Sequence, residues 1–231
     1  MQLFTIFQKL YQSLLQVMSN KSILIVIGTA HRMREPGKQS PDGRLKECVY
    51  SREICKAVAK KLQSHGYKVV IDYEPLDLPK NMQTPSYDLE KSRELGMRVN
   101  IVNEYCRQNG DNNVLYVSIH VDACGMGDKW LDANGWSVRV SPRASSRSKL
   151  LADCLFDAAK VKGLVTRKPA TTQKYWEQSL KVLNDTKCPA VLTENLFQDN
   201  KKDVDFLLSD KGKDTIVKLH VEGIINYIER V

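Results

Sequence analysis

The feature that most constrains this chain is an alternation of short apolar runs with longer helix-like stretches, which begins near residue 21. Runs rich in β-branched residues at Ser22–Ile27, Tyr67–Ile71 and Val114–Ile119 are typical of buried strands. Stretches with apolar residues at helical spacing lie between and beyond them, at Glu47–Ser64 and Leu89–Gln108. We therefore expect one α/β domain whose mixed, mostly parallel sheet is flanked by helices on both faces.

The second half of the chain continues this pattern. The remaining expected elements are strands at Trp136–Val140 and Pro189–Thr193 and helices at Ser146–Val161 and Asp214–Ile228. Ser145 or Ser146 suits the N-cap of the first of these helices. Trp176 and Leu180–Leu183 favour a further short strand before Pro189. Loops rich in proline and glycine are expected at Gly28–Arg44, Asp72–Asp88 and Asp122–Gly135.

Four residues with metal-binding or acid–base side chains lie where these strands end or where a helix begins. His31 and His120 follow or close apolar runs, Glu194 follows the run Pro189–Thr193, and Glu47 opens a helical pattern. Residues just past the carboxyl ends of parallel strands converge on one rim of a sheet, where ligands bind. Two imidazoles and two carboxylates there suit a catalytic zinc site, which takes three ligands and keeps one position open. The pattern leaves open whether Glu194 is a fourth ligand or the general base.

Other polar residues have simpler interpretations. His65 at a helix end and His220 inside the last helix are poor ligand candidates. Asp122 is placed to orient an imidazole, whereas the acidic side chains of the second long loop are expected to be solvated, namely Asp72, Glu74 and Asp77. The 6 cysteines form no CxxC pair and are expected to be reduced and mostly buried. Cys124, close to His120, is a minor candidate for a zinc thiolate.

The N-terminus and the net charge narrow the choice of partners. Residues 1–20 show helical spacing of apolar side chains but no basic start of an export signal, so we expect an amphipathic helical extension followed by one catalytic domain at 21–231. No run has the roughly 18 apolar residues of a membrane span. The net charge of +8 permits an anionic partner. The basic residues are scattered, however, which argues against nucleic acid, and nothing indicates an oligomeric state.

Several motifs together resemble the zinc-dependent N-acetylmuramoyl-L-alanine amidases, a family of cell-wall enzymes with a mixed α/β fold. The resemblance is spread over nearly all of residues 22–230. The matching segments are Thr29–His31 after a strand, GRLKE at Gly43–Glu47, RVNIVN at Arg98–Asn103, VSIHVDA at Val117–Ala123, Val182–Asn200 and the terminal GIINYIE. Departures from the family pattern occur at Arg32–Met33, Asp72–Tyr73 and Asp122, and they spare the metal-binding and catalytic positions.

The resemblance implies a specific reaction and a role for each candidate residue. His31, Glu47 and His120 would bind one zinc ion, and Glu194 would act as the catalytic base. The substrate would be peptidoglycan, cleaved at the amide bond between N-acetylmuramic acid and L-alanine. Asn134 and Arg139 are candidates for substrate binding, since a guanidinium suits a peptide carboxylate.

Two other functions compete with this one. A zinc exopeptidase or carboxypeptidase of related fold would use similar ligands, and a wall-binding protein with a silent site would need none of them. Without an evident signal peptide the protein is expected to be synthesised in the cytoplasm. It would then reach the cell wall as a phage lysin, an endolysin with bacteriolytic action, or as a delivered effector.

Overall fold

The computed structural model describes residues 22–231, and the expected extension at residues 1–20 lies outside them. Six strands form one sheet within the described part of the chain, in the order β2-β1-β3-β6-β4-β5. The strands are β1 (Leu24–Thr29), β2 (Lys68–Ile71), β3 (Val114–Asp122), β4 (Ser137–Val140), β5 (Trp176–Glu177) and β6 (Ala190–Phe197). Only the β4–β6 pair among them is antiparallel, so the expected mixed, mostly parallel sheet is confirmed.

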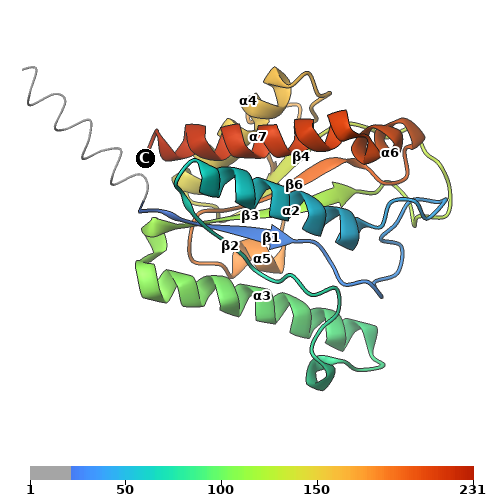
Figure 1. The fold of residues 1–231 in the computed structure, drawn as a ribbon, viewed down its shortest axis with the longest axis horizontal. Helices are drawn as coiled ribbons and strands as arrows, with labels where there is room; N and C mark the ends of the chain where they lie inside the picture. The colour runs from blue at the N-terminus through green and yellow to red at the C-terminus, as the bar shows by residue number, and fades with distance from the viewer. Residues whose placement is uncertain (1–21) are drawn as a thin grey trace, which may run out of the picture.

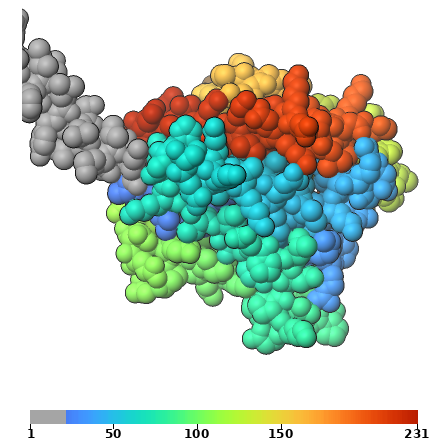
Figure 2. Space-filling model, viewed as in Figure 1, coloured from blue at the N-terminus to red at the C-terminus, as the bar shows by residue number. Residues whose placement is uncertain are grey.

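Helices cover both faces of this sheet (Figure 1). On one face lie α2 (Glu47–Ser64), α4 (Ser146–Val161), α6 (Lys201–Leu208) and α7 (Asp210–Ile228). On the other lie α3 (Tyr87–Asn109) and the short α5 (Lys181–Asn184), and single 3-10 turns occupy Lys80–Met82 and Asp111–Asn113. In the space-filling view, α2 and α7 form one continuous surface (Figure 2). No helix among residues 22–231 is both long enough and apolar enough to cross a membrane.

Successive side chains of a strand point to opposite faces of the sheet. Because helices cover both faces, both sets of side chains in the central strands are buried. In β1, Ile25 and Ile27 belong to the core beneath α2 and α7, whereas Leu24 and Val26 belong to the smaller core against α3. This explains why the strand reads as an unbroken apolar run rather than as an alternating one.

The expected elements agree with the structure in some places and differ in others. The helices at Glu47–Ser64 and Ser146–Val161 have the expected bounds, and the Ser145 hydroxyl caps the second by accepting a hydrogen bond from Ser148 N. The segment Leu180–Leu183 was wrongly expected to be a strand: Val182 and Leu183 belong to a helical turn that packs on α3. Helix α6 was not predicted, although the Asn200 side chain caps it and Val204 and Leu207 bury its inner face.

Strands β3 and β6 also run further than their apolar patterns indicated. His120 lies inside β3 and Glu194 inside β6, where the two residues are paired in register. Both strands therefore carry polar side chains within their hydrogen-bonded ladder rather than after it. A register shift between His120 and Asp122 marks where regular pairing gives way.

Candidate active site

His31, Glu47 and His120 meet at the carboxyl end of the sheet. His31 follows β1, Glu47 is the first residue of α2, and His120 lies near the end of β3. His31 Nε2 lies 3.3 Å from Glu47 Oε2, and His120 Nδ1 lies 3.1 Å from Glu47 Oε1. One ligand atom from each of the three residues can be chosen so that all lie within 4.8 Å of one another. The carboxylate thus stands between two imidazoles that arrive from different strands.

The electrostatics of this cluster follow from burial and from the central carboxylate. Burial lowers the pKa of His31, but the negative charges of Glu47 and Glu35 outweigh it and raise that pKa to about 9. Burial also lowers the pKa of His120, and Glu47 offsets only part of the effect. The two histidines hold the pKa of buried Glu47 well below its ordinary value despite the cost of burying its charge. Glu47 is therefore an ionised carboxylate, as a metal ligand must be.

These residues fit a divalent metal ion such as zinc. Two imidazole nitrogens and one carboxylate form a ligand set that zinc prefers and that leaves a coordination position for a small molecule. Glu47 Oε2 is buried and has no hydrogen-bond partner among the described residues, although it lies close to His31. The Lys38 ammonium is the next cation, at 3.9 Å from this oxygen. A metal ion held between Glu47 and the two imidazoles would give the buried oxygen a direct ligand bond.

The second nitrogen of each imidazole also has a partner. His31 Nδ1 lies 3.0 Å from Glu35 Oε2, and His120 Nε2 lies 3.1 Å from Ser118 Oγ. Partners of this kind fix the orientation and tautomer of metal-binding histidines. Neither partner was predicted from the sequence, whose pattern favoured Asp122 for this role. Asp122 instead pairs with Arg139 at 3.1 Å and with Arg167 at 3.3 Å.

Glu194 lies on β6, beside His120 in the paired register. Its Oε2 is buried and has no hydrogen-bond partner among residues 22–231. Burial and the neighbouring Asp122 carboxylate raise the pKa of Glu194 to about 8, although the Arg139 guanidinium opposes the rise. Arg139 Nε lies 3.9 Å from Glu194 Oε1. Glu194 is thus a carboxyl group with unusually high proton affinity for its type.

One cavity of about 310 Å³ is lined by His31, Glu47, His120 and Glu194. Arg139 lines it, whereas Asn134 does not: the Asn134 side chain is exposed, and its amide donates to the carbonyl of Asp132. Cys124 is exposed and lies outside the His31–Glu47–His120 group, and the other cysteines are buried and free. The apolar part of the cavity wall comes from α3, α5 and the strand ends, with Leu95, Leu180, Val182 and Leu192.

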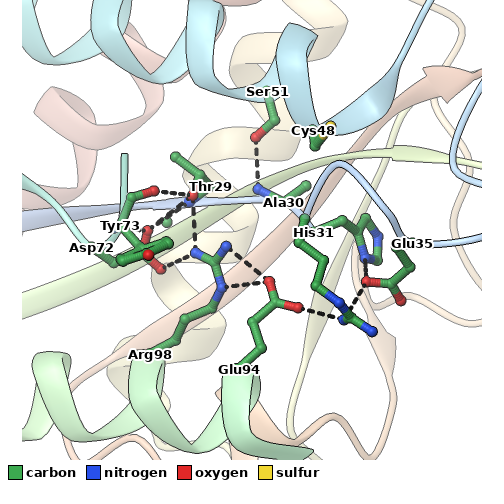
Figure 3. A network of polar contacts seen from close by, with 12 residues as sticks. Thr29, Ala30, His31, Glu35, Cys48, Ser51, Asp72, Tyr73, Glu94 and Arg98 are labelled. Atoms are coloured by element: carbon green, nitrogen blue, oxygen red, sulfur yellow. Dashed lines mark hydrogen bonds and ion pairs between the residues drawn. The ribbon is translucent and has the colours of Figure 1, made fainter. Parts of the chain in front are cut away.

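A network of buried charges supports the loop that carries His31 (Figure 3). Arg98 of α3 reaches Asp72 at 2.8 Å and Glu94 at 3.1 Å. Arg32 reaches Glu94 at 2.9 Å and Glu90 at 2.8 Å. The expectation that Asp72 lies in a solvated loop was wrong. It is 5% exposed, because the buried Arg98 guanidinium needs a carboxylate partner, and it also accepts a hydrogen bond from Thr29 N.

Comparison with known proteins gives this arrangement a context. The family model described as N-acetylmuramoyl-L-alanine amidase matches residues 25–226, which contain every residue of the cluster. The chain belongs to this family. An endolysin of Bacillus phage SPP1 is 27% identical over 147 residues, which are 63% of this chain and 52% of that protein. The chain spans about half the length of the curated relatives it matches.

Solved structures of amidases share the fold. The CwlD amidase of Clostridioides difficile, in a structure with the GerS lipoprotein, has a TM-score of 0.74 at 20% identity, with 90% of this chain and 100% of that one covered. The catalytic domain of the amidase CwlV from Bacillus (Paenibacillus) polymyxa has a TM-score of 0.68 at 19% identity, with 89% and 97% covered. The amidase fold inferred from the sequence is confirmed by these neighbours.

Proposed function

We propose that this protein hydrolyses the amide bond between N-acetylmuramic acid and L-alanine in peptidoglycan, with one zinc ion bound by His31, Glu47 and His120. The observation that carries the proposal is the position of Glu47, within 3.3 Å of one imidazole and 3.1 Å of the other. Membership of the amidase family supports the reaction type, and the SPP1 endolysin supports the cell wall as its place of action. The catalytic domain is inferred to span residues 21–231.

In this mechanism the protein supplies proton transfer and orientation. When bound, zinc supplies Lewis acidity to the attacking water and to the scissile carbonyl. Glu194 takes a proton from that water through Oε2, which has no hydrogen-bond partner in the described chain. As the carbon–nitrogen bond breaks, Glu194 gives this proton to the departing amine of L-alanine. Its raised pKa suits a group that must both accept and return a proton near neutral pH.

Arg139 has two roles in the proposed reaction. It lies near Glu194 and is itself held by Asp122 and by Gln178, whose side-chain oxygen accepts a 2.6 Å hydrogen bond from Arg139 Nε. This fixes a positive charge at the cavity wall, where it stabilises the ionised form of Glu194. It also gives a carboxylate of the substrate a partner in the cavity. Asn134, the other candidate for substrate binding, does not line this cavity, so we leave it out of the proposed substrate-binding wall.

The reaction is tested on purified peptidoglycan sacculi. We expect the protein to release stem peptides that begin with L-alanine, detected by mass spectrometry. A chelator should abolish the release and added zinc should restore it. Cleavage only within the stem peptide would instead identify a zinc peptidase, and zinc binding without any release would identify a wall-binding protein.

Glu194→Gln tests the role of the base separately from metal binding. The amide keeps the shape of the side chain but cannot accept the proton, so turnover should fall by about 10²- to 10⁴-fold while zinc stays bound. Zinc content measured by elemental analysis distinguishes the two roles left open by the sequence. Loss of zinc from this variant would make Glu194 a ligand.

A further inference from the structure

His31 has a backbone conformation that its residue type seldom adopts. Its φ is 44°, in the left-handed region, where a side chain with a Cβ is strained. Residues in such conformations are strained and persist only where surrounding contacts fix them. The contacts around His31 must therefore hold this conformation in place.

The main chain next to His31 is held by two residues of one helix. Ala30 N donates a 2.8 Å hydrogen bond to the Ser51 hydroxyl, and Arg52 donates to the carbonyls of Ala30 at 2.8 Å and His31 at 3.0 Å. Both Ser51 and Arg52 belong to α2, the helix that Glu47 begins. These bonds fix the position of the His31 backbone but leave the rotation and the tautomer of its ring undetermined.

The ring is held separately, by Glu35. The carboxylate of Glu35 lies 3.0 Å from His31 Nδ1 and is 1% exposed. Arg32 Nη1 at 3.2 Å and the Tyr87 hydroxyl at 2.9 Å donate to the same carboxylate. Lys91 Nζ lies 3.9 Å from Glu35 Oε1. Because these donors converge on Glu35 from the loop and from α3, its carboxylate has little freedom to turn away from the imidazole.

With a metal ion at Nε2, the His31 imidazole would keep its single proton on Nδ1, which lies 3.0 Å from Glu35 Oε2. We propose that Glu35 is a positioning residue that keeps this proton on Nδ1 of His31 and thereby presents Nε2 to the metal ion, on the side where Glu47 lies. The proposal rests on the proposed metal site. It distinguishes the two histidines: His31 is oriented by a carboxylate, whereas His120 is oriented by the neutral hydroxyl of Ser118.

Zinc affinity of the full chain tests this role without any substrate. We would measure it by competition with a chromophoric chelator for wild type, Glu35→Ala, Glu35→Gln and Glu90→Gln. Loss of a partner that orients a metal-binding histidine costs about 10- to 100-fold in affinity, and we expect Glu35→Ala to lie in this range. Glu35→Gln, which retains an acceptor but no charge, should lose less.

Glu90→Gln is the matched control. Glu90 bonds to Arg32 at 2.8 Å in the same buried network but does not contact His31. We expect its zinc affinity to stay within about threefold of the wild type. Equal losses in Glu90→Gln and Glu35→Ala would overturn the proposal, because the network would then act on folding alone. Unchanged affinity in Glu35→Ala would overturn it as well.

Nitrogen-15 spectra of the zinc-loaded protein give a second readout, which a purely structural role would not move. In the wild type, the His31 ring should carry its proton on Nδ1, and the signal of this proton should weaken or exchange faster in Glu35→Gln. Should Glu35→Ala fail to fold, Tyr87→Phe removes one donor to Glu35 without touching His31 and should lower zinc affinity a few-fold. An unchanged proton signal in Glu35→Gln would overturn the proposal.

The zinc measurement also separates this inference from the proposed function. If wild type binds zinc and His120→Ala does not, the metal site stands whatever Glu35 does. If these proteins bind zinc as expected but release no stem peptide, the proposed amidase reaction fails while the role of Glu35 is unaffected. Failure of wild type to bind zinc would overturn both.

Discussion

His220 illustrates how a single buried side chain connects the helical layer to β6. Its Nδ1 lies 2.7 Å from the carbonyl of Ile216 within α7, and its Nε2 lies 2.9 Å from the hydroxyl of Thr193, which immediately precedes Glu194. Nδ1 donates to this carbonyl, and the ring is buried without an acidic partner, which favours its neutral form. Burial lowers the pKa of His220 to about 4, well below its ordinary value of 6.5.

This lowered pKa predicts an acid-sensitive stability. As pH falls below about 6.5, His220 becomes protonated in the unfolded chain but stays neutral in the folded one. Its contribution to the free energy of unfolding is therefore fully present above pH 6.5 and is lost as pH falls toward 4. The total loss is about 3 kcal/mol. Urea unfolding of metal-free wild type and His220→Gln should show the difference between them shrinking over this range. Parallel stability curves would contradict the prediction.

Among individual residues, those with metal-binding or acid–base side chains could be predicted from the sequence, whereas the residues that contact them could not. His31, Glu47, His120 and Glu194 were predicted to lie together because strand ends in an α/β protein meet at one rim, and they line one cavity. Glu35 and Ser118 were missed, because a carboxylate in an irregular loop and a serine within an apolar strand carry no periodic signal. Their roles depend on contacts between segments, which only the folded chain displays.

The connection between β1 and α2 is the element on which the site depends most. Arg52 of α2 is 5% exposed, and its guanidinium donates to the Ala30 and His31 carbonyls of this connection. All of its hydrogen bonds within the described residues go to main-chain carbonyls, those of Ala30, His31, Cys48, Glu74 and Pro75. One guanidinium thus joins the His31 loop, the first turn of α2 and the loop after β2.

Replacing Arg52 should therefore loosen several segments together. Because buried carbonyls lose their donor, Arg52→Met should lower the free energy of unfolding by about 2–4 kcal/mol. Lysine keeps the charge but lacks the planar fork, so Arg52→Lys should recover only part of the loss. Urea unfolding measures both. The exposed Lys60 of the same helix is the control, and Lys60→Ala should change stability by less than about 0.5 kcal/mol.

Long periodic elements were predicted well, and short or irregular ones were not. Helices α2 and α4 matched because their apolar faces extend over several turns and because Ser145 marks the start of α4. The apolar runs marked the beginnings of β3 and β6 but not their ends. Polar side chains at a pocket interrupt the apolar pattern without interrupting the ladder of hydrogen bonds.

For the molecule as a whole, the proposed metal binding would be coupled to folding. The proposed ligands come from the loop after β1, from α2 and from β3, which lie together only in the folded sheet. A ligand that binds the folded state alone stabilises it in proportion to the logarithm of its concentration over its dissociation constant.

The topology could be predicted only as a class, since the order of β6 and β4 in the sheet leaves no mark in the sequence.

Chelation should therefore lower the melting temperature. Zinc at about 1,000 times its dissociation constant adds about 4 kcal/mol, which corresponds to about 8–16 °C for a domain of this size. Differential scanning calorimetry with and without chelator measures the shift. His120→Ala should show no such response to zinc, whereas a chelator-insensitive melting temperature in the wild type would count against the metal site.

The sheet order has one more consequence, which concerns the order of events during synthesis. β6 is the last strand along the chain, yet it lies between β3 and β4. All three proposed ligands precede β4, whereas Glu194 arrives with β6. A nascent chain that has left the ribosome only through β3 thus carries every proposed metal ligand but not the proposed base. If the proposed function holds, the complete metal site is translated before the residue that completes the catalytic machinery, and α6 and α7 follow that residue.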